Sequence, residues 1–268
     1  MNKLTEILNK TLSYKLAKSL FAEMKDWIEI IGNMGMNLFF SVKCLFTGQL
    51  KSKLFFEQAS RFGVDSLPIS LLMVGLAGMI IALQVANEMV KQGAGDYVGM
   101  LVSVAIVREL GPVIGGFAVI SMVGSSMAAE ISTMKVTQQV DAIKVLGVNP
   151  IYYLITPRVI AGIFIMPFVV IIANAVGIVG GMIMSKLVTE LNAENYINSV
   201  WVGLTVKDFF VSIFKGSVFG GIIALSCSSI GYRTEGGAID VGKATTSAVV
   251  WSFILMLIAD YFISFVCY

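Results

Sequence analysis

Five long apolar stretches constrain this chain more than any other feature. Each could form a helix of about 20 or more residues, the length that crosses roughly 30 Å of hydrocarbon. Only 13% of the 268 residues are charged and 57% are hydrophobic, whereas a soluble domain averages about 25% charged residues. The sequence therefore predicts an all-α integral membrane protein with five spans, at about residues 67–90, 97–129, 151–187, 209–230 and 244–266.

The first 50 residues predict interfacial helices that precede a five-span domain at 51–268. Residues 1–24 carry leucine at every fourth position together with several lysines. This pattern is typical of a basic amphipathic helix on an anionic membrane surface, and a targeting peptide is the alternative. Residues 27–46 are less apolar and are interpreted as an elbow helix in one leaflet, with a sixth span as the alternative.

The distribution of basic residues predicts the orientation in the membrane. Nine of the 19 lysines and arginines lie in residues 1–66, and none follows Asp260. The loops at 130–158 and 231–243 fall on the same side as the N-terminus if there are five spans. Because cytoplasmic loops are enriched in Lys and Arg, we expect the N-terminus and these loops to be cytoplasmic and the C-terminus to be outside.

Several classes of chemistry are excluded by composition. The chain contains no histidine, and its three cysteines lie far apart, which argues against a Ser-His-Asp triad and against a zinc site. The net charge of +2 is too small for a nucleic-acid-binding protein. Residues 237–244 nearly fit a phosphate-binding loop, but Ala244 replaces the hydroxyl residue that holds magnesium. If ATP drives this protein, another chain must hydrolyse it.

The loop at 130–158 predicts a short helix between the second and third spans. Thr137 is a plausible N-cap, and Gly147 followed by Pro150 is a typical helix end. The polar face would carry Gln138, Asp141 and Lys144. This helix is either a surface connector or a docking helix for a cytoplasmic partner.

Charged residues inside the spans are functional candidates, because a charge in hydrocarbon is costly. Arg108 and Glu109 interrupt the second span, and Pro112 cannot donate a hydrogen bond to the carbonyl of Arg108. Adjacent helical residues point about 100° apart, so these two side chains need not pair with each other. Either they form structural ion pairs, or they border a lipid-sized cavity. Glu130, Lys215 and Asp260 are candidates for an intramembrane polar network.

Three glycine pairs occur at GxxxG spacing within the spans: Gly111/Gly115, Gly177/Gly181 and Gly216/Gly220. Small residues at this spacing allow two helices to approach closely in a membrane. The motif is common, so it indicates close packing and does not indicate an oligomeric state.

Three motifs together resemble the MlaE-type (MCE-associated) ABC transporter permease family. They are VRELGP at 107–112, AEISTMKVTQ at 129–138 and DAIKVLGVNP at 141–150. The resemblance extends from about Trp27 to the C-terminus, and the order and spacing of the three motifs make it specific. One departure is Met122, because relatives often carry arginine at this position.

The resemblance implies a homodimeric permease that moves phospholipids or related lipids between inner and outer membranes. It implies a cytoplasmic ATPase dimer that binds ATP and Mg²⁺, an MCE-domain periplasmic protein and, in many systems, a STAS-domain protein. The location would be the bacterial inner membrane, with a chloroplast inner envelope as the alternative. The short helix would be the coupling helix, with Thr137, Gln138, Asp141, Lys144 and Gly147 facing the ATPase. The lipid cavity at the dimer interface would be bordered by Arg108, Glu109, Ile81, Val85, Glu88 and Met89.

Three other functions remain open on the sequence alone. A proton-coupled secondary transporter could use the carboxylates of Glu109, Glu130 and Asp260, although the inverted repeats typical of such transporters are not visible. A membrane scaffold would only anchor partners. A membrane enzyme is the weakest of the three, since the chain shows no nucleophile or metal motif.

Overall fold

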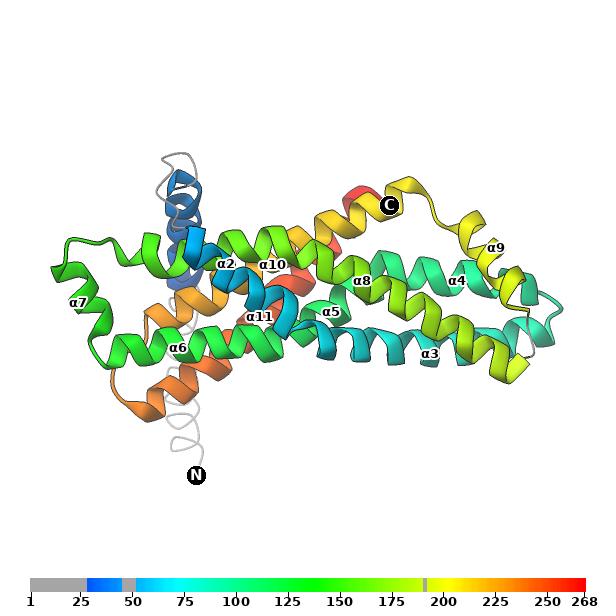
Figure 1. Ribbon diagram of the computed structural model, residues 1–268, viewed down its shortest axis with the longest axis horizontal. Coiled ribbons are helices and arrows are strands. Elements are labelled where there is room, and N and C mark those ends of the chain that lie inside the picture. Colours follow the sequence, from blue (N-terminus) through cyan, green and yellow to red (C-terminus); the bar gives the residue numbers. More distant parts are fainter. Residues whose placement is uncertain (1–27, 45–51, 190–191) are drawn as a thin grey trace, which may run out of the picture.

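The computed structural model describes residues 28–44, 52–189 and 192–268, which form an elongated bundle of helices (Figure 1). Residues 28–44 are helical, whereas the helix expected at 1–24 lies outside the described residues. The remaining elements are α2 (Ser52–Ser60), η1 (Arg61–Asp65), α3 (Leu67–Lys91), η2 (Gly95–Tyr97), α4 (Val98–Ala105), η3 (Ile106–Leu110), α5 (Gly111–Val119), η4 (Ile120–Gly124), α6 (Ser125–Val136), α7 (Gln139–Val145), η5 (Ile151–Ile155), α8 (Thr156–Thr189), α9 (Ala193–Gly203), α10 (Val206–Tyr232) and α11 (Ala238–Cys267).

Within the described residues, five continuous helical stretches are long and apolar enough to cross a membrane, which confirms the predicted all-α class and agrees with the predicted five spans. They are Ser52–Lys91, Gly95–Val136, Ile151–Thr189, Val206–Tyr232 and Ala238–Cys267. The first stretch includes α2 and η1, and its apolar helix α3, Leu67–Lys91, matches the span predicted at 67–90. In the preceding, more polar segment Glu57 and Arg61 form an i,i+4 ion pair along the helix.

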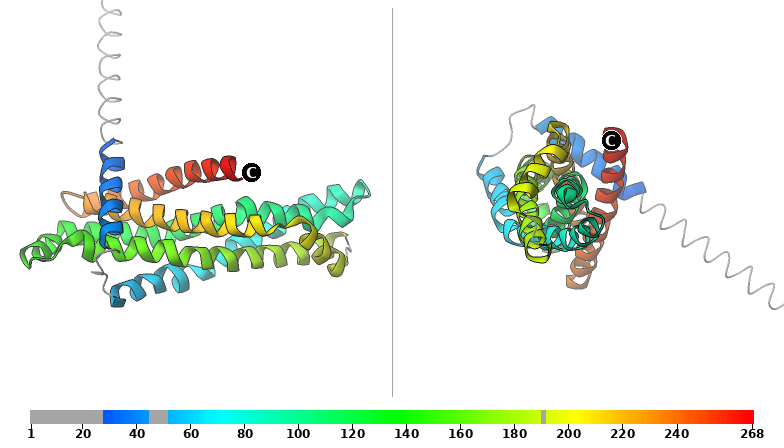
Figure 2. Two further views of the ribbon diagram at one scale, coloured as in Figure 1. Left: turned by 90° about the horizontal axis from the view of Figure 1, so that it is seen from above. Right: turned by 90° about the vertical axis from the view of Figure 1, so that its right-hand side faces the viewer.

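The helix at residues 28–44 runs across the bundle instead of along it (Figure 2). Asn37 donates a hydrogen bond to Ser229 on α10 at 2.8 Å, and Glu29 forms an ion pair with Arg233 at 3.0 Å. The crossing direction favours the elbow interpretation over a sixth span parallel to the others. The depth of this helix in a bilayer stays a prediction.

The two ends of the bundle carry different connections. The helix α7, the turn between α10 and α11 and the helix at 28–44 lie toward one end, while α9 and the turn after α3 lie at the other (Figure 1). This separation agrees with the predicted alternation of loops. Which end faces the cytoplasm stays a prediction.

Close helix approaches organise the interior around α8, which packs against both α3 and α10. Gly162 on α8 and Gly220 on α10 face each other so closely that a Cβ on either would overlap the carbonyl oxygen of the other. A Cβ on Gly78 of α3 would likewise overlap the carbonyl oxygen of Gly177 on α8. The fully buried ring of Phe62 lies beside Gly162, and Phe219 is also fully buried in the same core cluster.

The α8–α10 contact gives a direct stability prediction. Gly220→Ala should destabilise the protein by roughly 1–3 kcal/mol, since the added methyl group forces the two backbones apart. Gly242→Ala on α11 is a matched control, because a Cβ there meets nothing within 4 Å and alanine is the better helix former. The midpoint of thermal unfolding of each detergent-purified variant measures its change in stability. Equal midpoints for the two variants would contradict the close contact.

Candidate functional site

The charged pair of the second span lies on a π-helical segment, η3, that interrupts the α-helix. Such π-bulges are frequent at functional sites because they redirect side chains. Pro112 leaves the carbonyl of Arg108 without its usual helical donor, and Lys215 on α10 donates to that oxygen at 2.7 Å. The sequence predicted the missing hydrogen bond, and the structure shows which side chain replaces it.

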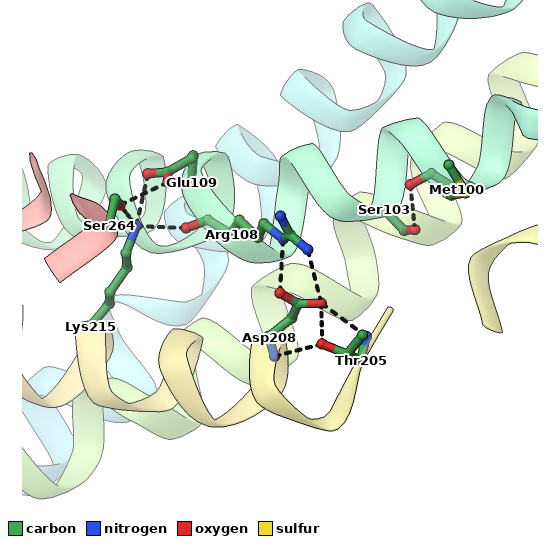
Figure 3. A network of polar contacts seen from close by, with 8 residues as sticks. All are labelled: Met100, Ser103, Arg108, Glu109, Thr205, Asp208, Lys215 and Ser264. Atoms are coloured by element: carbon green, nitrogen blue, oxygen red, sulfur yellow. Dashed lines mark hydrogen bonds and ion pairs between the residues drawn. The ribbon is translucent and has the colours of Figure 1, made fainter. Parts of the chain in front are cut away.

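Lys215 is the centre of a network that joins the second, fourth and fifth spans (Figure 3). Its side chain is fully buried, and its Nζ lies 2.8 Å from Glu109 Oε2 and 2.7 Å from Asp260 Oδ1. Ser264 accepts a hydrogen bond from Lys215 at 2.7 Å and donates one to Glu109 at 2.8 Å. Two of the three residues predicted to form an intramembrane network, Lys215 and Asp260, therefore do meet, and they are joined by Glu109.

Arg108 points to a different partner, Asp208 at the start of α10. Arg108 Nε lies 2.8 Å from Asp208 Oδ1, and the ring of Tyr268 lies 4.4 Å from the guanidinium carbon. Asp208 is held by a capping box, in which Thr205 donates to it through both its backbone N–H and its hydroxyl. The expectation that Arg108 and Glu109 need not pair with each other is confirmed.

The side-chain exposures show what this region can do chemically. Lys215 is fully buried and Asp208 is 1% exposed, while Arg108 and Glu109 are 34% and 43% exposed. Asp208 contacts Nε and Nη2 of Arg108, so a ligand phosphate would compete with Asp208 at these two nitrogens. No group of three or more His, Cys, Asp or Glu side chains placed to hold a metal ion lies within residues 28–44, 52–189 and 192–268.

Glu130 does not belong to the Lys215 network. It lies in the middle of α6 (Ser125–Val136), where its Oε2 is 2.5 Å from Arg61 Nη1 and 3.0 Å from Arg158 Nη2. Arg158 is almost completely buried and also donates to the carbonyl of Leu154 at 2.5 Å. The predicted network of Glu130, Lys215 and Asp260 is therefore two separate clusters.

The short helix predicted in the loop at 130–158 is present as α7, but its start differs from the prediction. Thr137 is not its N-cap: the Thr137 hydroxyl donates back to the carbonyl of Thr133 at 2.7 Å, at the end of α6. Gln138 turns the chain instead, with a left-handed φ of 61°. The predicted end at Gly147 is confirmed by its φ of 76° and by the hydrogen bond from its N–H to the carbonyl of Lys144.

The polar side chains of α7 contact one another and the bundle. Asp141 lies 2.9 Å from Lys144 and 3.6 Å from Lys135. The hydrogen bond from Lys144 holds the pKa of Asp141 below its usual range. Val140 is buried, whereas Val145 and Leu146 at the end of the helix are 89% and 79% exposed. The exposed end of α7 is thus apolar. The sequence analysis predicted a polar docking face and did not include Val145 or Leu146 in it.

The four candidate residues on the first span lie apart from this polar region. Ile81, Val85 and Met89 are partly buried and pack against a small core cluster with Val98 and Tyr196. Glu88 is exposed and pairs with Lys91 at 2.9 Å. A single copy of the chain therefore gives no contact that assigns these four residues to a lipid cavity.

A cavity of about 570 Å³ lies between the helix at 28–44 and the helices α8, α10 and α11. Its lining is apolar apart from Ser217, and it includes Met34, Gly35, Phe214 and Leu255. Neither Arg108 nor Glu109 lines it.

Three site residues escaped the sequence interpretation: Asp208, Ser264 and Tyr268. Asp208 carried a readable signal, because Thr205-x-x-Asp208 before an apolar stretch is a capping box. Ser264 and Tyr268 carried none, since their contacts depend on how α11 is rotated against the second span.

The five apolar helices are those of a multi-pass membrane protein. A family model described as Permease MlaE matches residues 55–266. A probable ABC transporter permease protein of Synechocystis sp. is 38% identical over 221 residues, which is 82% of this chain and 84% of the relative. A second one, of Rickettsia typhi, is 38% identical over 87% of this chain and 90% of the relative. The chain belongs to the MlaE permease family.

A plant relative extends the comparison. Protein TRIGALACTOSYLDIACYLGLYCEROL 1, chloroplastic, of Arabidopsis thaliana is 38% identical over 208 residues. The match covers 78% of this chain and 59% of the plant protein. The family resemblance drawn from the three sequence motifs is confirmed.

Proposed function

We propose that this chain is the membrane subunit of an ATP-driven transporter that moves phospholipids or related lipids between the inner and outer membranes. The observation that carries the proposal is family membership across residues 55–266, together with relatives named as probable ABC transporter permeases. The chain acts as a transport subunit and not as an enzyme. ATP and Mg²⁺ bind to a separate ATPase.

The exposed tip of α7 supports the ATPase contact. Val145 and Leu146 are large, apolar and exposed at one end of the bundle, and such residues are typical of a surface that a partner covers. Buried Val140 anchors α7 against the bundle. A movement of the ATPase would therefore pass through α7 to the spans, and α7 acts as the coupling helix.

The lipid substrate is supported by the name of the plant relative, which refers to a glycerolipid. In this proposal two copies of the chain form a cavity that holds the lipid between them, and Arg108 and Glu109 border that cavity. An MCE-domain protein on the outer side receives or supplies the lipid, and a STAS-domain protein can join the ATPase. The chain lies in the bacterial inner membrane with α7 and the N-terminus in the cytoplasm.

Co-purification tests the proposal directly. The tagged chain is isolated from its native host in mild detergent, and the bound proteins and lipids are identified by mass spectrometry. We expect an ATPase, an MCE-domain protein and an enriched phospholipid. Repeated recovery of the chain alone, with no enriched lipid, would contradict the proposal.

A further inference from the structure

Glu130 links α6 to two elements, η1 and α8, against which α6 itself packs little. One carboxylate oxygen, Glu130 Oε2, forms ion pairs with two arginines. It lies 2.5 Å from Nη1 of Arg61 on η1 and 3.0 Å from Nη2 of Arg158 on α8. The backbone of α6, which carries Glu130, packs mainly against α10 and α11, whereas α2 packs mainly against α8. The three side chains therefore connect the second span to both the first and the third.

Two members of the cluster, Glu130 and Arg158, lie before and after α7 in the sequence. Glu130 lies on the helix that leads into α7, and Arg158 lies on the helix that follows it. The ion pair between Lys135 and Asp141 at 3.6 Å joins α7 to α6, and the buried Val140 packs into a core cluster that includes Ala128 of α6 and Ile155 of η5. On the α8 side, the link is the turn that begins at Gly147. A displacement of α7 would reach α6 through the Lys135–Asp141 ion pair and α8 through the turn and η5.

We propose that Glu130, Arg61 and Arg158 form a clamp that makes the first, second and third spans move together when α7 is displaced. Arg158 is suited to this role because it is buried and already fixed by the carbonyl of Leu154. Planar guanidinium groups hold a carboxylate in a defined geometry. This inference rests on the proposed function, and it makes these three residues positioning residues that touch neither lipid nor ATP.

The test measures how much lipid is moved for each ATP hydrolysed. The full complex of this chain and its ATPase is reconstituted in vesicles of phosphatidylethanolamine and phosphatidylglycerol that contain a fluorescent phospholipid. For Glu130→Gln we expect the ratio of lipid moved to ATP hydrolysed to fall about fivefold or more, in the range of measured coupling effects. ATP hydrolysis itself should change by less than about twofold.

Two further variants separate this role from simple stabilisation. Glu130→Asp keeps the charge and should retain most of the wild-type ratio of lipid moved to ATP hydrolysed. Glu57→Gln is the matched control, because Glu57 contacts only the outer side of the cluster, at 3.7 Å from Arg61, and should leave the ratio unchanged. If Glu130→Gln does not fold, Arg61→Gln takes its place, since the Arg61 side chain is 33% exposed.

Each outcome has a distinct meaning. A wild-type complex that moves no lipid on ATP addition would overturn the proposed function itself. A wild-type complex that moves lipid, with Glu130→Gln at the same ratio, would overturn only the clamp. If ATP hydrolysis and lipid movement by Glu130→Gln fall by the same factor, the clamp is also overturned, because a parallel fall indicates that Glu130 only stabilises the protein.

Discussion

Lys215→Met is expected to destabilise the protein by about 3–5 kcal/mol, the usual cost of leaving a buried charge without its partner. The change removes the ammonium group between Glu109 and Asp260 and the donor to the carbonyl of Arg108. Methionine has a similar length, so little packing is lost. Thermal unfolding in detergent should show a lower midpoint, by an amount on the order of 10 °C.

A triple variant identifies the cause. Adding Glu109→Gln and Asp260→Asn to Lys215→Met removes the two stranded charges, and most of the stability should return. Lys243→Ala serves as the surface control, because Lys243 is 74% exposed and pairs only with its helical neighbour Asp240. If Lys215→Met unfolds at the wild-type temperature, Lys215 is not the counter-ion of this network.

The double variant Val145→Gln/Leu146→Gln should lose its ATPase partner. Both side chains are exposed at the tip of α7, so the substitutions do not disturb the fold. Full burial of a valine or leucine side chain contributes about 1.5–3 kcal/mol, so losing both at the interface should weaken binding by more than about tenfold. The amount of ATPase that co-purifies with the tagged chain measures the effect.

Ile239→Gln provides the matched control for α7. Ile239 is 77% exposed and lies at the start of α11, at the same end of the bundle as α7 (Figure 1). It should retain the ATPase. Equal recovery of the ATPase with the double variant and with wild type would contradict the assignment of α7 as the coupling helix.

The spans were predictable because hydrocarbon thickness sets a length that apolar residues must fill. Gly147 was predictable for a similar reason, since a left-handed helix end favours glycine. Thr137 was mistaken for an N-cap because a threonine hydroxyl can bond forward to N–H groups or backward to a carbonyl. The hydrogen bond to Thr133 shows that it bonds backward here.

Ion-pair partners were beyond the reach of the sequence. Arg108 and Asp208 are separated by 100 residues, and only the rotation and depth of each span decide which charges meet. The same applies to Lys215, whose carboxylates come from the second and fifth spans. The grouping of Glu130 with Lys215 failed because Glu130 lies on α6, toward one end of the Gly95–Val136 stretch and beside Arg158, whereas the Lys215 partner Glu109 lies on η3.

The most direct test of the central claim is lipid movement by the reconstituted complex under separate control of its energy sources. Vesicles with a fluorescent phospholipid are supplied with ATP or a non-hydrolysable analogue, with and without a proton ionophore. We predict movement that requires hydrolysable ATP and continues when the ionophore has collapsed the proton gradient. Movement that needs no ATP and stops with the ionophore would contradict the account, and would point to a proton-driven transporter.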